Sequence, residues 1–154
     1  PRLLTMANGN KDIVKAALTF MFLQYGSPCI FYGTEIGLAG ENDPDCRKCM
    51  IWDVKQQDRD MLSFMKELIQ LRRCHAREIS LGQISWHDVR NEDKVVGFTK
   101  KTGEHELLCY FNKGNQDLRL SFDVQPNVLF ANLAKKDGNT LIVQENGFVI
   151  YKKD

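Results

Sequence analysis

The chain has 154 residues, of which 27% are charged, and its formal net charge is +1 at pH 7. This charge balance excludes the strongly basic surface of a typical nucleic-acid-binding protein, and it excludes an acidic disordered tail. The length fits one ordinary domain, or a small domain with an appended piece of another. The chain has five cysteines, an odd number that does not resemble the paired cysteines of a small disulfide-bonded domain. We therefore expect reduced thiols and a cytoplasmic location.

The most apolar stretch, residues 13–25, is interrupted by Lys15 and is shorter than the roughly 20 residues that a membrane span requires. We therefore expect no membrane segment and no membrane partner. The chain starts with Pro1 and shows neither an initiator Met nor the pattern of a signal peptide. This start predicts a segment from the middle of a longer protein.

The first half predicts a helix, a buried strand and a second helix. Residues 10–26 begin with candidate caps, carry apolar residues around most of the helix circumference, and end at a glycine. The run 29–32 is short and apolar and is bounded by Pro28 and Gly33, as in a parallel strand that is buried on both faces. Residues 58–73 place apolar side chains along one stripe, which predicts an amphipathic helix.

From about residue 78 onward the hydrophobic period becomes two. Short apolar segments separated by turn residues predict an antiparallel β-sandwich or barrel. Asn146 and Gly147 stand between two apolar runs, and this dipeptide predicts a hairpin turn. We therefore divide the chain into residues 1–77 and a β-sandwich at 78–154. Because one strand and two helices cannot cover their own apolar faces, we interpret 1–77 as the end of a larger α/β domain.

Residues 40–53, with the sequence GENDPDCRKCMIWD, predict a long charged loop directly after the strand. Ligand-binding loops of α/β barrels and open α/β sheets follow the carboxyl ends of strands. The C-x-x-C pair, Cys46 and Cys49, leaves a zinc site or a redox pair open. Completing a zinc site would require Cys74 and His75, which as helix neighbours point about 100° apart. We therefore expect reduced thiols, no metal and no cofactor.

Four motifs carry a family resemblance: PRLLT at residues 1–5, YGTEIG at 32–37, NDPDCRKCM at 42–50 and FMKELIQLRR at 64–73. Together they resemble the α-amylase family, glycoside hydrolase family 13, and within it the group of neopullulanases, maltogenic amylases and cyclomaltodextrinases. The resemblance implies an α+β chain: the terminal helix, strand and helix of a (β/α)8 barrel, followed by an antiparallel C-terminal sandwich. It also implies a retaining glycosidase whose partner is an α-glucan such as starch, pullulan or a cyclodextrin.

The resemblance places no catalytic residue in this chain. In the family, the nucleophile and the acid lie on earlier strands, and a third Asp follows a His just before the stretch that matches PRLLT. That Asp would lie about two residues upstream of Pro1. The chain by itself is therefore expected to be inactive, and its uncovered apolar faces favour self-association.

The resemblance points to Asp43 and Arg47 as substrate-binding residues, and Tyr32, at the end of the predicted strand, is a third candidate. A carboxylate accepts and a guanidinium donates, so the pair can fix one orientation of a sugar ring. Asp43 and Arg47 could instead only pair with each other, and Tyr32 could belong to the core. For Trp52 and Trp86 we expect packed, half-buried side chains rather than sugar stacking.

Two other functions stay open from the sequence. The β half could be an independent glucan-binding module, which would require a row of exposed aromatic side chains. It could also serve a purely structural role.

Overall fold

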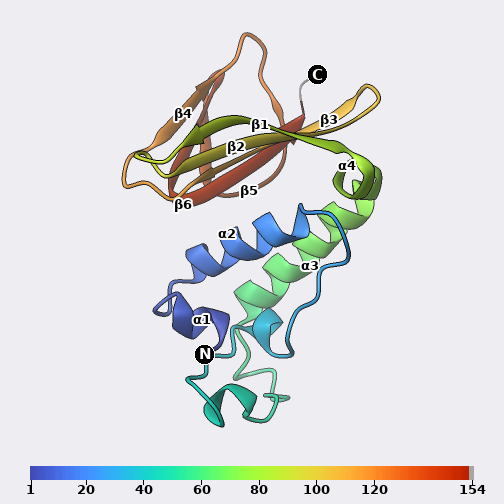
Figure 1. The fold of residues 1–154 in the computed structure, drawn as a ribbon. Coiled ribbons are helices and arrows are strands. Elements are labelled where there is room, and N and C mark those ends of the chain that lie inside the picture. Colours follow the sequence, from blue (N-terminus) through green and yellow to red (C-terminus); the bar gives the residue numbers. More distant parts are fainter. Residues whose placement is uncertain (153–154) are drawn as a thin grey trace.

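Helices α2 (Lys11–Phe22) and α3 (Arg59–Cys74) lie beneath one face of a six-stranded antiparallel sheet (Figure 1). The structure is a computed structural model that describes residues 1–152. The remaining elements are α1 (Leu3–Met6), η1 (Thr34–Ile36), η2 (Asp45–Arg47), α4 (Ala76–Leu81), β1 (Gln83–Arg90), β2 (Val95–Thr102), β3 (His105–Asn112), β4 (Leu118–Ser121), β5 (Asn127–Asp137) and β6 (Thr140–Lys152).

Both predicted long helices are confirmed, and polar side chains cap their first turns. The side chain of Asn10 accepts a hydrogen bond from the N–H of Asp12 at 2.9 Å, and that of Asp58 accepts from the N–H of Met61 at 3.1 Å. These acceptors satisfy N–H groups that have no partner inside the helix. Asp58 also forms an ion pair with Lys11, so the two helix starts are tied together.

Residues 29–32 do not form the predicted buried strand. They run as an irregular segment between α2 and η1, and Cys29, Phe31 and Tyr32 are exposed. A strand requires backbone partners on neighbouring strands, and within residues 1–152 no strand pairs with this segment. The barrel arrangement of residues 1–77 is therefore not seen in this chain and stays a prediction.

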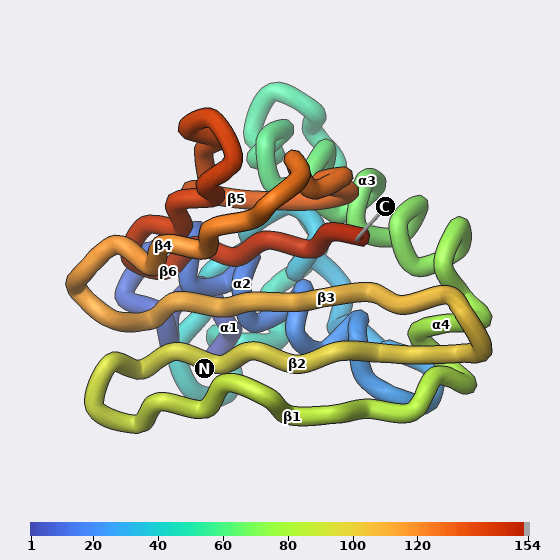
Figure 2. The backbone as a smooth tube through the Cα atoms, turned by 90° about the horizontal axis from the view of Figure 1, so that it is seen from above, coloured from blue at the N-terminus to red at the C-terminus, as the bar shows by residue number. Residues whose placement is uncertain are grey.

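The sheet is organised around β6. The strand order of the sheet is β1-β2-β3-β6-β4, and β5 pairs with the other edge of β6. Seen from above, β1, β2, β3 and β6 run side by side over the helices (Figure 2). The first half of β6 pairs with β4 and the second half with β3, while β5 accompanies both halves. One strand thus joins the two parts of a curled, sandwich-like sheet.

The predicted hairpin turn at Asn146 and Gly147 is wrong, because both residues lie inside β6. Asn146 adopts a φ of 59°, and on β5 the facing irregularity contains Leu133 with a φ of 49°. A Cβ on Gly147 would lie 2.7 Å from the carbonyl oxygen of Leu133. The dipeptide therefore provides the left-handed conformation and the close approach at which β6 bends and changes partners.

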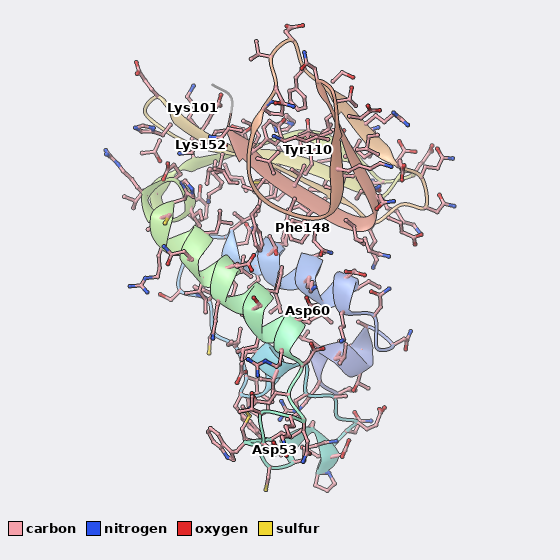
Figure 3. All side chains as sticks on the ribbon, turned by 180° about the vertical axis from the view of Figure 1, so that it is seen from behind. Asp53, Asp60, Lys101, Tyr110, Phe148 and Lys152 are labelled. Carbon is pink, nitrogen blue, oxygen red and sulfur yellow. The ribbon has the colours of Figure 1, made fainter. Side chains whose placement is uncertain are left out.

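Both faces of the sheet are buried. On β6, Phe148 and Ile150 pack toward the helices, while Val149 and Tyr151 belong to a second cluster on the opposite face. Figure 3 shows Phe148 on the helix side of the sheet and Tyr110 on the other side. The mixed helix-and-strand composition and the antiparallel curled sheet are as predicted. Because one cluster joins α2, α3 and the sheet, the two halves share a core, and the boundary near residue 78 stays a prediction.

Three further observations concern membranes, thiols and metals. Within residues 1–152, no helix is both long enough and apolar enough to cross a bilayer. All five cysteines are free thiols, and only Cys109 is fully buried. Between residues 1 and 152 no group of three or more His, Cys, Asp or Glu side chains is placed to hold a metal ion.

His75 lies where α3 ends and α4 begins, and its side chain is largely buried. Its Nδ1 is 3.7 Å from Oε1 of Glu78, which is also 3.3 Å from Nζ of Lys152. The pKa of His75 lies below its ordinary value of 6.5, first because burial disfavours the charged ring and then because of the charge of Lys152; Glu78 acts in the opposite direction.

The lowered pKa of His75 predicts a loss of stability in weak acid. As the pH falls through 6.5, the unfolded chain binds a proton at His75 more readily than the folded chain, so the free energy of unfolding should decrease. His75→Asn should remove this part of the pH dependence, whereas His105→Asn, at an exposed position, should keep it. Urea unfolding at about pH 7.5 and about pH 5.5 measures the change. Equal changes in the wild type and His75→Asn would contradict the assignment.

Candidate functional site

Residues 40–53, here called the charged loop, lie at the end of the molecule farthest from the sheet (Figure 1). The start of the loop is fixed by the first residues of the chain. The carbonyl of Gly40 accepts a hydrogen bond from the N–H of Arg2 at 2.8 Å, and the N–H of Gly40 donates to Oγ1 of Thr5 at 2.9 Å. A Cβ on Gly40 would lie 3.0 Å from the backbone of Asp45 and Cys46, so the close approach requires glycine.

Asp43 and Arg47 form an ion pair on the surface of the charged loop. Nε of Arg47 donates to Oδ1 of Asp43 at 2.9 Å, and Nη2 donates to Oδ2 at 3.4 Å. The short 3-10 helix η2, which ends at Arg47, turns the chain so that Arg47 comes back to Asp43. The mutual pairing that the sequence left open is therefore present. A sugar at this place would meet one preformed, exposed pair of charges.

The carboxylate of Asp43 has a second partner. Sγ of Cys46 donates to Oδ1 of Asp43 at 2.9 Å. The pKa of Asp43 is lowered first by this hydrogen bond and then by the charge of Arg47, and the pKa of Cys46 is raised by the same bond. At neutral pH the pair therefore presents a carboxylate beside a guanidinium, and Cys46 stays a protonated thiol.

Asp45 stiffens the middle of the charged loop. Its Oδ2 accepts from the N–H of Glu41 at 2.6 Å, and its Oδ1 is 3.0 Å from Nζ of Lys48. These contacts, led by the one from Glu41, lower the pKa of Asp45. Asp43 and Asp45 are thus both held as carboxylates, whereas a general acid in glycoside hydrolysis requires a raised pKa. These two carboxylates are therefore placed to accept hydrogen bonds and not to protonate a leaving group.

Tyr32 reaches the charged loop from the other side. Its hydroxyl donates to the carbonyl of Lys48 at 2.7 Å, next to Arg47. Its own carbonyl accepts from Nη1 of Arg2 at 2.6 Å. The Tyr32 side chain is 38% exposed and packs against Phe31, with ring centroids 4.5 Å apart. Tyr32 is therefore a surface residue. The structure joins Asp43 directly to Arg47, and Tyr32 contacts the same turn through the Lys48 carbonyl.

The two tryptophans differ. Trp52, in the charged loop, is 80% exposed, so the prediction of a packed side chain is wrong for it. Trp86 is half exposed and packs against Phe98 with ring centroids 5.0 Å apart, as predicted for a residue on the core-facing side of its strand.

The sequence did not single out Arg2, which contacts both Tyr32 and Gly40. The only signal for Arg2 in the sequence was a cation within the largely apolar motif PRLLT.

Comparisons with known proteins identify relatives of the chain. No protein-family model matches it. It is 46% identical over 114 residues to an intracellular maltogenic amylase of Bacillus subtilis strain 168, a match that covers 74% of this chain and 19% of the relative. It is 33% identical over 159 residues to a cyclomaltodextrinase of Geobacillus thermopakistaniensis, covering 98% of this chain and 27% of the relative. The chain thus spans only a minor part of these relatives.

Solved structures agree with the sequence matches. A cyclomaltodextrinase structure superposes with a TM-score of 0.78 at 27% identity, covering 98% of this chain and 27% of that one. The arrangement of helices and curled sheet is therefore shared with an enzyme of the predicted group. The chain is homologous to part of the maltogenic amylases and cyclomaltodextrinases of the α-amylase family, as its motifs predicted.

Proposed function

We propose that the chain is part of a retaining glycoside hydrolase that acts on α-glucosidic bonds of α-glucans such as starch, pullulan or cyclodextrins. The observation that carries this proposal is the 46% identity over 114 residues to a maltogenic amylase. The word intracellular in the name of that relative supports a cytoplasmic enzyme. In the proposal this chain supplies substrate contacts and no catalytic residue.

The proposed contacts are made by Asp43, Arg47 and Tyr32. Sugar hydroxyls both donate and accept hydrogen bonds, so a carboxylate and a guanidinium held side by side can engage two neighbouring hydroxyls. The exposed Asp43–Arg47 pair supports this role because its outward edge is open to a ligand. Tyr32 keeps the Arg47 end of the turn in place through Lys48 and offers its half-exposed ring beside it.

We further propose that residues 29–32 keep their path and pair as a barrel strand when the rest of the enzyme is present, which the superposition of 98% of this chain on a cyclomaltodextrinase supports. Their exposed side chains, Phe31 among them, would then be covered by neighbouring strands. The same exposure favours self-association of the chain by itself. An independent glucan-binding role for the β half is less well supported, because Tyr151 is buried and Phe130 packs against Phe64 and Phe148.

A chimeric enzyme tests the proposed function. The part of the Geobacillus cyclomaltodextrinase that matches this chain is replaced by residues 1–154, and hydrolysis of cyclodextrin, pullulan and soluble starch is measured. We expect turnover by the chimera and none by the chain alone, because the carboxylates that cleave the bond lie elsewhere in the enzyme. A folded chimera without turnover, or turnover by the purified chain above a buffer blank, would contradict the proposal.

A further inference from the structure

Arg2 contacts two points of the candidate site, Gly40 and Tyr32. Its backbone N–H donates to the carbonyl of Gly40, where the charged loop begins. Its Nη1 donates to the carbonyl of Tyr32. The guanidinium carbon lies 4.9 Å from the ring centroid of Phe31 and 4.6 Å from that of Tyr32, within the range of a cation–π contact. The Arg2 side chain thus joins the first residues of the chain to Tyr32, which lies 30 positions further along the sequence.

Arg2 is nearly buried, with an exposed fraction of 6%. Its Nε and Nη2 are buried and have no hydrogen-bond partner in the part of the chain that the structure describes. A buried guanidinium with free donors is costly, and structures rarely retain one without a reason. The two aromatic faces and the Tyr32 carbonyl offset part of this cost. They do so only while Tyr32 and Phe31 stay where they are.

The backbone around Arg2 leaves room for this arrangement. A Cβ on Gly33 would lie 3.3 Å from Nη1 of Arg2, and a Cβ on Gly40 would lie 3.3 Å from its Cδ. Gly33 also has a φ of 81°, which other residues rarely adopt. On its open side Arg2 borders a cavity of about 270 Å³ that Cys46 also lines. The guanidinium therefore sits between the Tyr32 segment and the turn that carries the ion pair.

We propose that Arg2 is a positioning residue: its guanidinium holds Tyr32, and through the Tyr32–Lys48 contact the turn of the charged loop, in the geometry that meets the glucan. The role of Arg2 in catalysis rests on the proposed function. That the loop conformation depends on one guanidinium is a separate statement, which can be tested without a substrate. The Arg2 side chain acts through the Tyr32 carbonyl and the Tyr32–Lys48 hydrogen bond, whereas the contact to Gly40 is made by the Arg2 backbone; the side chain touches no reacting atom.

Amide hydrogen exchange of the chain, followed by NMR, tests this proposal. In Arg2→Ala we expect exchange at residues 40–48 to accelerate about tenfold or more, while the protected amides of β3 and β6 keep their rates. Arg77→Ala, which removes an exposed Arg from α4, is the matched control and should change neither. Arg2→Lys is the milder variant in case Arg2→Ala fails to fold, and it should also release the loop, because an ammonium lacks the planar fork.

Chemical rescue separates positioning from general stabilisation. Millimolar guanidinium should restore slow exchange in the loop of Arg2→Ala by entering the space that the side chain leaves, and methylammonium should not. In the chimera, Arg2→Lys should raise KM more than it lowers kcat, since the loop binds and does not react. Unchanged loop exchange in both Arg2 variants, or acceleration spread equally through the sheet, would overturn the proposal. A released loop in Arg2→Ala together with a folded chimera that shows no turnover would contradict the proposed function and leave this inference standing.

Discussion

Replacing Arg47 by Ala in the chimeric enzyme is expected to lower kcat/KM on cyclodextrin about 10- to 100-fold, the cost of losing a charge-assisted hydrogen bond to substrate. The variant also leaves the carboxylate of Asp43 with only the Cys46 thiol as a side-chain partner. Asp43 would then be free to rotate, so the orientation of the bound sugar should be lost together with the contact. Steady-state kinetics on cyclodextrin and maltotriose measure the effect.

Lys48→Ala is the control for a general loss of charge in the charged loop. Lys48 contributes its backbone carbonyl to the Tyr32 contact and its side chain only to the ion pair with Asp45, so a much smaller effect is expected. Arg47→Lys should recover only part of the activity, because an ammonium cannot reproduce two parallel hydrogen bonds to one carboxylate. Equal kcat/KM for wild type, Arg47→Ala and Lys48→Ala would remove Arg47 from the binding site.

Replacing Phe148 by Ala is expected to lower the free energy of unfolding by about 3–5 kcal/mol. Phe148 is fully buried on the helix side of β6. Its ring centroid lies 5.6 Å from that of Phe111, 5.6 Å from that of Phe130 and 6.4 Å from that of Phe64 on α3. The cavity would open between the helices and the sheet, where the two halves of the chain share a core.

Urea unfolding followed by circular dichroism measures this loss. Val124→Ala, at a position that is 72% exposed between β4 and β5, should change the stability by less than about 0.5 kcal/mol. We also expect the helical and sheet signals of Phe148→Ala to disappear in one transition. A Phe148→Ala variant that unfolds at the same urea concentration as the wild type would show that the shared core is not formed.

Local signals in the sequence predicted the helices well. The caps Asn10 and Asp58 act on hydrogen bonds within one turn, so the residues that decide the helix starts are themselves in the sequence. The period-two segments of the β half likewise predicted β1 to β6, because successive side chains of a strand point to opposite faces of the sheet. The pattern did not reveal that one long strand, β6, would serve both parts of the sheet.

The wrong predictions for residues 29–32 and for Asn146–Gly147 have one cause. In both places the structure depends on strand-pairing partners that are distant in sequence. Residues 29–32 have the composition of a buried strand, but a strand forms only beside other strands, and none pairs with this segment in the described chain. The Asn146–Gly147 dipeptide permits a left-handed backbone, and the pairing with β5 decides that it bends a strand instead of ending one.

The candidate site was predictable in its residues and not in its geometry. The family resemblance selected Asp43 and Arg47, and the position at the end of the predicted strand selected Tyr32. The Asp43–Arg47 ion pair lies within one turn, whereas the contact of Tyr32 with that turn and the burial of Arg2 require segments that are distant in sequence, which no local pattern encodes. The prediction for Trp52 failed because its side chain stays 80% exposed in the described chain.

The central claim is that the charged loop, with Tyr32 beside it, contacts an α-glucan. An NMR titration of the isotope-labelled chain with maltotriose tests it most directly, with Arg47→Ala titrated in parallel. The account predicts saturable shifts at residues 32 and 43–48 of the wild type that are lost in Arg47→Ala, with the amides of β1 to β6 unmoved. Shifts confined to the sheet, or identical behaviour of the two proteins, would contradict it.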